Sequence, residues 1–218
     1  MSQELYNFFR FISIGSPAIP LLVGILFFKR ISRTQKTLLI LVVVALTTEI
    51  TAYQLHKSKI LVNNIVIYNA YTLIAFNCLW ILYRYEIALL KKRIALGLQF
   101  IINIFGILNA SLIQGWNSFN SNLMIVTAIS FLILATLSFR QILQQVKYTR
   151  LEKTPIFWIN TGIFIYYSGT LILFALSNKI SVDPSAANLH LVVWALNCIF
   201  NSLLNTAYGF ALWQRPKK

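Results

Sequence analysis

Apolar residues are gathered along the chain in seven long runs that are separated by short polar segments. Each run has about 17 or more residues, which is enough for one helix to cross a bilayer. The runs are continuous and do not alternate with polar residues, so they predict helices rather than barrel strands. We therefore expect an all-α polytopic membrane protein, with one seven-helix bundle over residues 1–218 and spans at 11–28, 38–55, 60–83, 94–113, 123–139, 156–176 and 189–213.

The composition agrees with a membrane protein. Hydrophobic residues make up 58% of the chain and charged residues only 11%. The charged fraction is about half of what soluble domains carry. A soluble core of this size could not use so much apolar surface, so a multi-pass location in a membrane is expected.

Lysine and arginine divide unequally between the two sets of loops. Fifteen of the 19 follow the first, third, fifth and seventh spans, and the other four are Arg10, Lys57, Lys59 and Lys179. Basic loops stay in the cytoplasm, so the pattern predicts an outer N-terminus and a cytoplasmic C-terminus. A basic rim beside anionic lipid explains the net charge of +14, so the bilayer is the expected partner and nucleic acid is not.

The spans lack the residues that several kinds of membrane chemistry need. Span 189–213 has no lysine for a retinal Schiff base, and the two histidines lie at the edges of different spans, which is too little for zinc. No HExxH, Walker or GxSxG motif occurs. We therefore expect no cofactor and no metal, and we predict that the protein is not an enzyme.

One carboxylate, Glu49, falls inside a predicted span. Such a group costs roughly 2.5–3.5 kcal/mol on insertion scales and is therefore a candidate functional residue. By helical rise it lies about 17 Å from the cytoplasmic end of its span, level with Asn69 and Asn197, which we expect as its hydrogen-bond partners. The candidate ligand-binding residues are Glu49, Asn69, Tyr71, Asn160, Tyr166, Tyr167, Trp194, Asn197 and Asn201.

Two interpretations of this polar layer stay open. The amides and hydroxyls could join helices by hydrogen bonds, or they could line a site for a small uncharged or amphipathic ligand. In the last span, the spacing of His190, Trp194, Asn197, Asn201 and Asn205 puts these residues on one helix face, which should look into the bundle.

The loop after the fifth span has a helical pattern of its own. Ile142, Leu143 and Val146 share one face of a helix. We therefore expect the fifth span to continue as a helix through Tyr148, near the lipid headgroups or as a surface for a partner.

Several short motifs together resemble a known group of proteins. They are SPAIP at 16–20, YNAYT at 68–72, FWINTG at 157–162, YYSG at 166–169 and NCIFN at 197–201. With the Glu in the second span, this layout is similar to uncharacterised seven-span inner-membrane proteins of the Bacteroidota. The resemblance implies a bacterial inner-membrane location and an association with two-component signalling. It assigns no activity to any residue.

Two functions are compatible with these patterns. The first is a receptor or signalling module that binds a small amphipathic ligand or lipid in the outer half and acts on a partner at the basic cytoplasmic loops. The second is a carrier of a small neutral solute, because an offset of 120 residues aligns AFNCL at 75–79 with ALNCI at 195–199. That repeat would give a 3+1+3 arrangement of spans like that of small sugar transporters. The nearly apolar inner parts of the second and fourth spans favour the receptor.

Overall fold

The computed structural model describes residues 1–58, 63–88, 90–145, 150–182 and 187–214, and the regular structure in these ranges is helical. Seven stretches are long and apolar enough to cross a membrane, which confirms the predicted fold class. The α-helices are α1 Gln3–Gly15, α2 Ala18–Leu26, α3 Arg33–Lys57, α4 Ile65–Glu86, α5 Lys92–Leu108, α6 Ser121–Gln145, α7 Pro155–Val182 and α8 Ala187–Trp213. The short elements are the 3-10 turns η1 Phe28–Arg30 and η3 Leu151–Lys153 and the π-helix η2 Asn109–Ile113.

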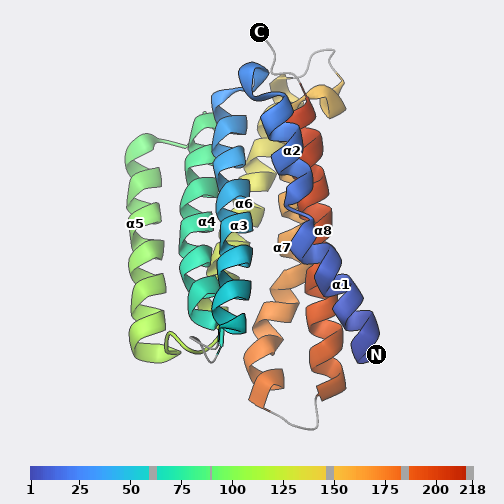
Figure 1. The fold of residues 1–218 in the computed structure, drawn as a ribbon. Helices are drawn as coiled ribbons and strands as arrows, with labels where there is room; N and C mark the ends of the chain where they lie inside the picture. The colour runs from blue at the N-terminus through green and yellow to red at the C-terminus, as the bar shows by residue number, and fades with distance from the viewer. Residues whose placement is uncertain (59–62, 89, 146–149, 183–186, 215–218) are drawn as a thin grey trace.

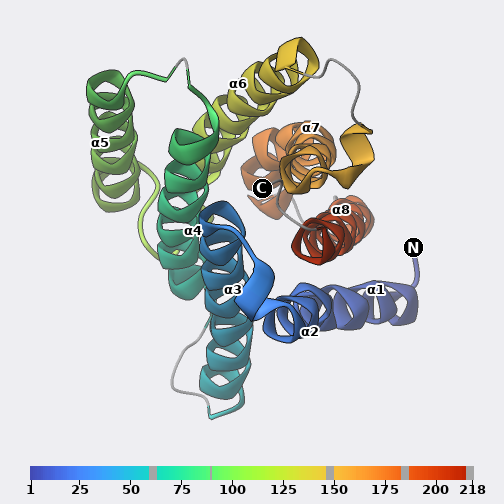
Figure 2. The ribbon, with the colours of Figure 1, turned by 90° about the horizontal axis from the view of Figure 1, so that it is seen from above.

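The spans form an up-and-down bundle in which α5 lies at the edge (Figures 1 and 2). α8 packs against α7 on one side and against α1 and α2 on the other, and α7 packs on α6. α3 and α4 form a second close pair, which meets the rest of the bundle through contacts with α2, α8 and α6. α5 joins this arrangement through α4 and α6.

One end of the bundle is strongly basic. Successive spans run in opposite directions, so the loops after α2, α4 and α6 lie at the same end as the last turn of α8 (Figure 1). We call this the basic end, and its described cations include Lys29, Arg30, Arg33, Arg84, Lys92, Arg93, Arg140, Arg150 and Lys153. The other end, where Asn117 lies, is called the opposite end. That the basic end faces the cytoplasm stays a prediction from charge.

The first span begins earlier than predicted and is broken in the middle. α1 starts at Gln3, where the Ser2 side chain accepts a hydrogen bond from the Leu5 amide at 3.3 Å. Pro17 follows the end of α1 and has no amide hydrogen to donate, so the helix stops there and α2 restarts at Ala18. The predicted start at Phe11 is therefore wrong, and Arg10 lies on the spanning helix instead of before it.

The other boundaries differ by a few residues. The third span begins at Ile65 instead of residue 60. It ends at Glu86 instead of residue 83, so the last turn of α4 includes Arg84. The fifth span continues beyond 139 to Gln145, as expected. The rest of that predicted extension, 146–148, lies outside the described residues.

α7 and α8 approach each other closely at two glycines. A Cβ atom on Gly162 would lie 2.8 Å from the Ala207 Cβ, and one on Gly169 would lie 2.3 Å from the Phe200 ring. Glycine at these positions allows one helix to lie directly on its neighbour. This pair therefore forms a rigid wall of the bundle.

Candidate functional site

Glu49 forms a hydrogen bond across the α3–α4 pair. Its Oε2 accepts from the Tyr68 hydroxyl at 3.0 Å. The side chain is half-buried and lies about 24 Å along α3 from Arg33, nearer to the opposite end. Its contact with the third span was predicted correctly, but the expected partners Asn69 and Asn197 are wrong.

Asn69 binds a loop instead of the carboxylate. Neighbouring residues on a helix point about 100° apart, so Tyr68 faces α3 while Asn69 faces the loop between η2 and α6. The Asn69 Nδ2 donates to the carbonyl oxygens of Trp116 and Ser118, at 2.9 Å each, and its Oδ1 accepts from the Asn120 amide at 3.3 Å. With all these bonds made, Asn69 acts as an anchor for the loop.

Side chains from three other helices lie within electrostatic range of the Glu49 carboxylate. Arg10 on α1 lies within electrostatic range of Glu49, as do Tyr71 on α4 and Cys198 on α8. Tyr166 on α7 is within the same range of both Tyr71 and Cys198. We call these residues, with Tyr68, the Glu49 site.

Arg10 and Glu49 carry opposite charges and lie within electrostatic range of each other. No ion pair joins Arg10 to Glu49 in the described part of the chain, although the two charges are close enough to interact. Arg10 is exposed on α1, and among the described residues the Tyr68 hydroxyl is the hydrogen-bond partner of Glu49. The acid therefore keeps acceptor capacity for another group.

Several polar atoms near this level are unpartnered among the described residues. The hydroxyls of Tyr71, Tyr166 and Tyr167 make no hydrogen bond there. The Oδ1 of Asn197, the residue before Cys198, is buried and also lacks a partner. Buried polar groups are nearly always bonded, so these atoms are the ones available to a ligand or to water.

The other predicted residues on α8 contact the first span and the loop before α6. Asn201 Nδ2 donates to Ser13 Oγ and Asn205 Nδ2 to Ser16 Oγ, each at 2.9 Å, beside the break between α1 and α2. Trp194 donates to His190 at 2.9 Å and packs edge-on against Phe119 from the α5–α6 loop. The polar face of this helix therefore mainly joins the bundle together.

Asn160 lies toward the basic end, about 9 Å along α7 from Tyr166, whereas Tyr167 directly follows Tyr166. Asn160 is fully buried, accepts from the Tyr83 hydroxyl at 3.0 Å and donates to Ser138 at 2.8 Å. The Tyr167 ring packs against Phe131, with 5.3 Å between ring centroids. Both residues belong to the aromatic core, and Asn160 is not part of the Glu49 site.

Sequence reasoning missed two features of this region. Arg10 was placed outside the membrane because Asn7 and Arg10 interrupt the first apolar run, although Leu5, Phe8 and Phe9 already indicate a span. It also missed the amide group of Asn109, Gln114, Asn120 and Asn122, which ties the π-helix η2 to α6. The clustering of these amides around a loop was the available signal.

The Glu49 site offers polar groups and aromatic rings to a ligand. The described residues contain no group of three or more His, Cys, Asp or Glu that could hold a metal ion. Its carboxylate, guanidinium and hydroxyls can donate to and accept from a polar headgroup, and its aromatic rings can contact an apolar body. No family model matches the chain, and no curated protein and no solved structure is detectably similar to it, so the resemblance to inner-membrane proteins of the Bacteroidota stays a prediction.

Proposed function

We propose that this protein is a receptor-like membrane module that binds a small amphipathic molecule or a lipid headgroup at the Glu49 site. The observation that carries the proposal is the pair of intramembrane charges, Arg10 and Glu49, which lie within electrostatic range of each other and form no ion pair among the described residues. An ionisable residue within a span is costly and usually has a function. A ligand with both donors and acceptors would bridge the two charges.

The position of the site favours a ligand that enters from the lipid or from the opposite end. Glu49 is about 24 Å from the basic end of α3, and Arg10 is about 10 Å from the start of α1. Both therefore lie in the half of the bundle away from the basic loops. An amphipathic molecule could keep its apolar part in the bilayer while its polar head contacts the carboxylate.

A layer of aromatic residues supports a receptor more than a carrier. Phe76, Tyr83 and Phe131 are each at most 1% exposed and fill the bundle between the Glu49 site and the basic end. The rings of Phe76 and Phe131 are 5.6 Å apart, and Phe76 also contacts Trp80 at 5.3 Å. Solute passage would require this packed layer to open, whereas signalling would not.

The break in the first span provides a connection to the basic end. α1 carries Arg10 and is separated from α2 by Ser16 and Pro17. α2 packs closely on α3 and α8 near the basic end, where a Cβ on Gly24 would lie 2.4 Å from Leu39 and 3.3 Å from Leu212. A ligand that draws α1 toward Glu49 would therefore shift α2 relative to α3 and α8. A signalling partner at the basic loops would detect this shift.

The proposal can be tested by identifying the molecule that stays bound to the protein during purification. We expect the wild-type protein in mild detergent to retain an amphipathic molecule, detectable by mass spectrometry after solvent extraction. Glu49→Leu should retain at least about tenfold less, which corresponds to losing about 1.4 kcal/mol of binding free energy. Glu152→Gln neutralises an exposed carboxylate at the basic end and should behave as the wild type. Equal retention by wild type and Glu49→Leu, or none by either, would contradict the proposal.

A second measurement separates the receptor from the carrier. The molecule identified above would be offered to sealed vesicles that contain the protein, and its uptake would be followed over time. We expect binding without accumulation inside the vesicles. Uptake that depends on Glu49 would support the carrier instead.

A further inference from the structure

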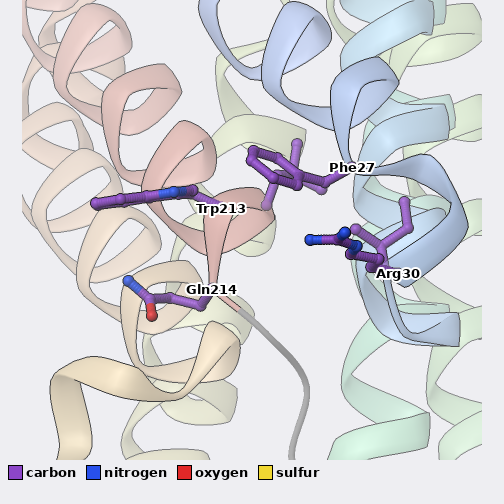
Figure 3. Close-up of a pocket in the computed structure, with 6 residues that line it drawn as sticks. Phe27, Arg30, Trp213 and Gln214 are labelled. Carbon is purple, nitrogen blue, oxygen red and sulfur yellow. The ribbon is translucent and has the colours of Figure 1, made fainter.

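A hollow lies at the basic end, between the end of α2 and the last turn of α8 (Figure 3). Its cavity volume is about 90 Å³, which leaves room for several water-sized groups. Apolar residues, Phe27, Ile31 and Leu212, form part of the lining, and the polar part consists of Arg30, Trp213 and Gln214. No acidic residue is among the residues that line it.

Arg30 is the one cation among the described residues that line this hollow. Figure 3 shows its side chain reaching across the hollow toward the end of α8. Two nearby cations are engaged elsewhere, since Arg33 lies 4.2 Å above the Tyr85 ring and Lys36 lies 5.6 Å above the Phe28 ring. The Arg30 guanidinium has no ion pair or side-chain hydrogen bond among the described residues. It is therefore an available fork of donors, and such forks match phosphate oxygens well.

Trp213 and Gln214 line the hollow from the end of α8, and in Figure 3 their side chains point away from Arg30. The Trp213 indole N–H and the Gln214 side-chain amide make no hydrogen bond in the described structure. Trp213 is 58% exposed, as is typical of the aromatic belt at a membrane interface. The exposed Trp213 ring therefore places the hollow at the depth of lipid headgroups, where Arg30 can contact a phosphate.

The hollow is held in shape by a buried glutamine. Gln35 is fully buried, and its Nε2 donates to the carbonyl oxygens of Ala211 at 2.7 Å and Gln214 at 2.9 Å. These bonds join the start of α3 to the end of α8 and satisfy carbonyls that would otherwise oppose an anion. The site is thus formed before a ligand arrives, which favours binding.

Exposed apolar side chains continue from the hollow along both helices. On α2, Leu22 and Leu26 are 62% and 77% exposed, and on α8, Phe210 is 39% exposed. In a membrane these side chains face acyl chains. A ligand with a phosphate head and hydrocarbon tails therefore fits this position better than a soluble anion does.

We propose that this hollow binds the phosphodiester headgroup of an anionic phospholipid, with Arg30 as the main contact. The lipid's tails lie along the exposed apolar face of α2, and its phosphate accepts from the Arg30 guanidinium. This site is separate from the Glu49 site, and neither proposal depends on the other.

The test measures the binding of two lipids to the delipidated protein by native mass spectrometry. Phosphatidylglycerol is the anionic probe and phosphatidylcholine the zwitterionic one. We expect the first phosphatidylglycerol to bind about tenfold more tightly than phosphatidylcholine, because a charge-assisted hydrogen bond adds to its affinity. Arg30→Gln should remove this preference, and Arg30→Lys should lower it about threefold, since an ammonium cannot make the bidentate contact.

Arg93→Gln is the matched control, because Arg93 is also exposed at the basic end but lies at the start of α5. It should keep the preference, and gel filtration with circular dichroism should show that each variant is folded. The proposal is overturned if Arg30→Gln binds phosphatidylglycerol like the wild type, or if Arg93→Gln loses the preference equally. It is also overturned if glycerol 3-phosphate displaces the lipid at similar concentrations, since the site would then bind a soluble anion. If Arg30→Gln does not fold, the Arg30→Lys variant is the test. The proposal is then overturned if Arg30→Lys prefers phosphatidylglycerol over phosphatidylcholine as strongly as the wild type does.

Discussion

Amide side chains act in this bundle as hydrogen-bonding links between helices. Asn77 on α4 and Asn103 on α5 bond each other at 2.7 Å, and Asn201 on α8 bonds Ser13 on α1. Water is scarce within a bilayer, so a polar side chain there needs a protein partner. Asn197 differs because its buried Oδ1 has none in the described structure, which is why it remains a candidate for ligand contact.

The Glu49–Tyr68 pair can be tested by a double-mutant cycle. Glu49→Leu and Tyr68→Phe each remove the bond, and these two variants and the double variant would be unfolded reversibly in mixed micelles. The expected coupling free energy is about 0.6 kcal/mol, the usual value for a hydrogen bond between membrane helices. Glu49→Gln alone should fold, because the amide oxygen can still accept from the tyrosine hydroxyl. A coupling energy of zero would mean that the observed bond contributes nothing to stability.

Asn69 should control the loop between η2 and α6. Asn69→Ala removes three hydrogen bonds to residues 116–120, so the backbone amides of this loop should exchange hydrogen faster. Asn197→Ala is the matched control, because its buried oxygen has no bond to lose. Hydrogen exchange followed by mass spectrometry measures both. If the loop amides exchange hydrogen equally fast in the two variants, Asn69 does not anchor the loop.

At the scale of helices, close packing distinguishes α7–α8 from the peripheral α5. The described part of α5 carries many exposed apolar residues, among them Phe100 at 66% and Ile101 at 61%. It is attached to α4 by the Asn77–Asn103 pair and by the Trp80 indole, which donates to the Ala95 carbonyl at 3.0 Å. The attachment of α5 to the bundle therefore depends on hydrogen bonds, whereas α7 and α8 are held together by close packing of their side chains.

Two glycine variants should have opposite effects on stability. Gly162→Ala places a methyl group 2.8 Å from the Ala207 Cβ, and such overpacking should lower the free energy of unfolding by about 1–3 kcal/mol. Gly97→Ala on α5 meets no atom within 4 Å, so it should be neutral or raise this energy by up to about 1 kcal/mol through helix propensity. Thermal unfolding in detergent measures both. A stabilised Gly162→Ala variant would contradict the close contact.

The helices were predictable from sequence where apolar runs are long and uninterrupted. The spans of α5 and α8 match their predicted ends within two residues, because the polar segments around them are distinct. The start of the first span was not predicted correctly, because Arg10 interrupts its apolar pattern. Within the site, the cost of an intramembrane carboxylate identified Glu49, but its partner depends on how α4 is rotated about its axis. Packing with α3 and the loop sets that rotation, and composition does not reveal it.

At the scale of the whole molecule, the orientation in the membrane can be tested by labelling. Asn117 is exposed in the loop at the opposite end. In a variant with Cys78→Ala and Cys198→Ala, Asn117→Cys should react with an impermeant thiol reagent added to the outer side of intact cells. Labelling only after the inner side is opened would reverse the predicted topology. A cysteine at Arg93, at the basic end, is the control and should show the opposite pattern.

The contact between α1 and α8 also has a consequence for the synthesis of the protein, because the two helices are made at different times. Asn201 bonds Ser13 across a separation of 188 residues. At about 5–20 residues per second, a ribosome needs about 10–40 s to make the chain between them. During this interval the broken first helix waits in the bilayer, with Ser13 and Ser16 lacking their amide partners. The nascent protein should therefore pass through a long-lived open form, in which insertion machinery or a chaperone has access to the first span.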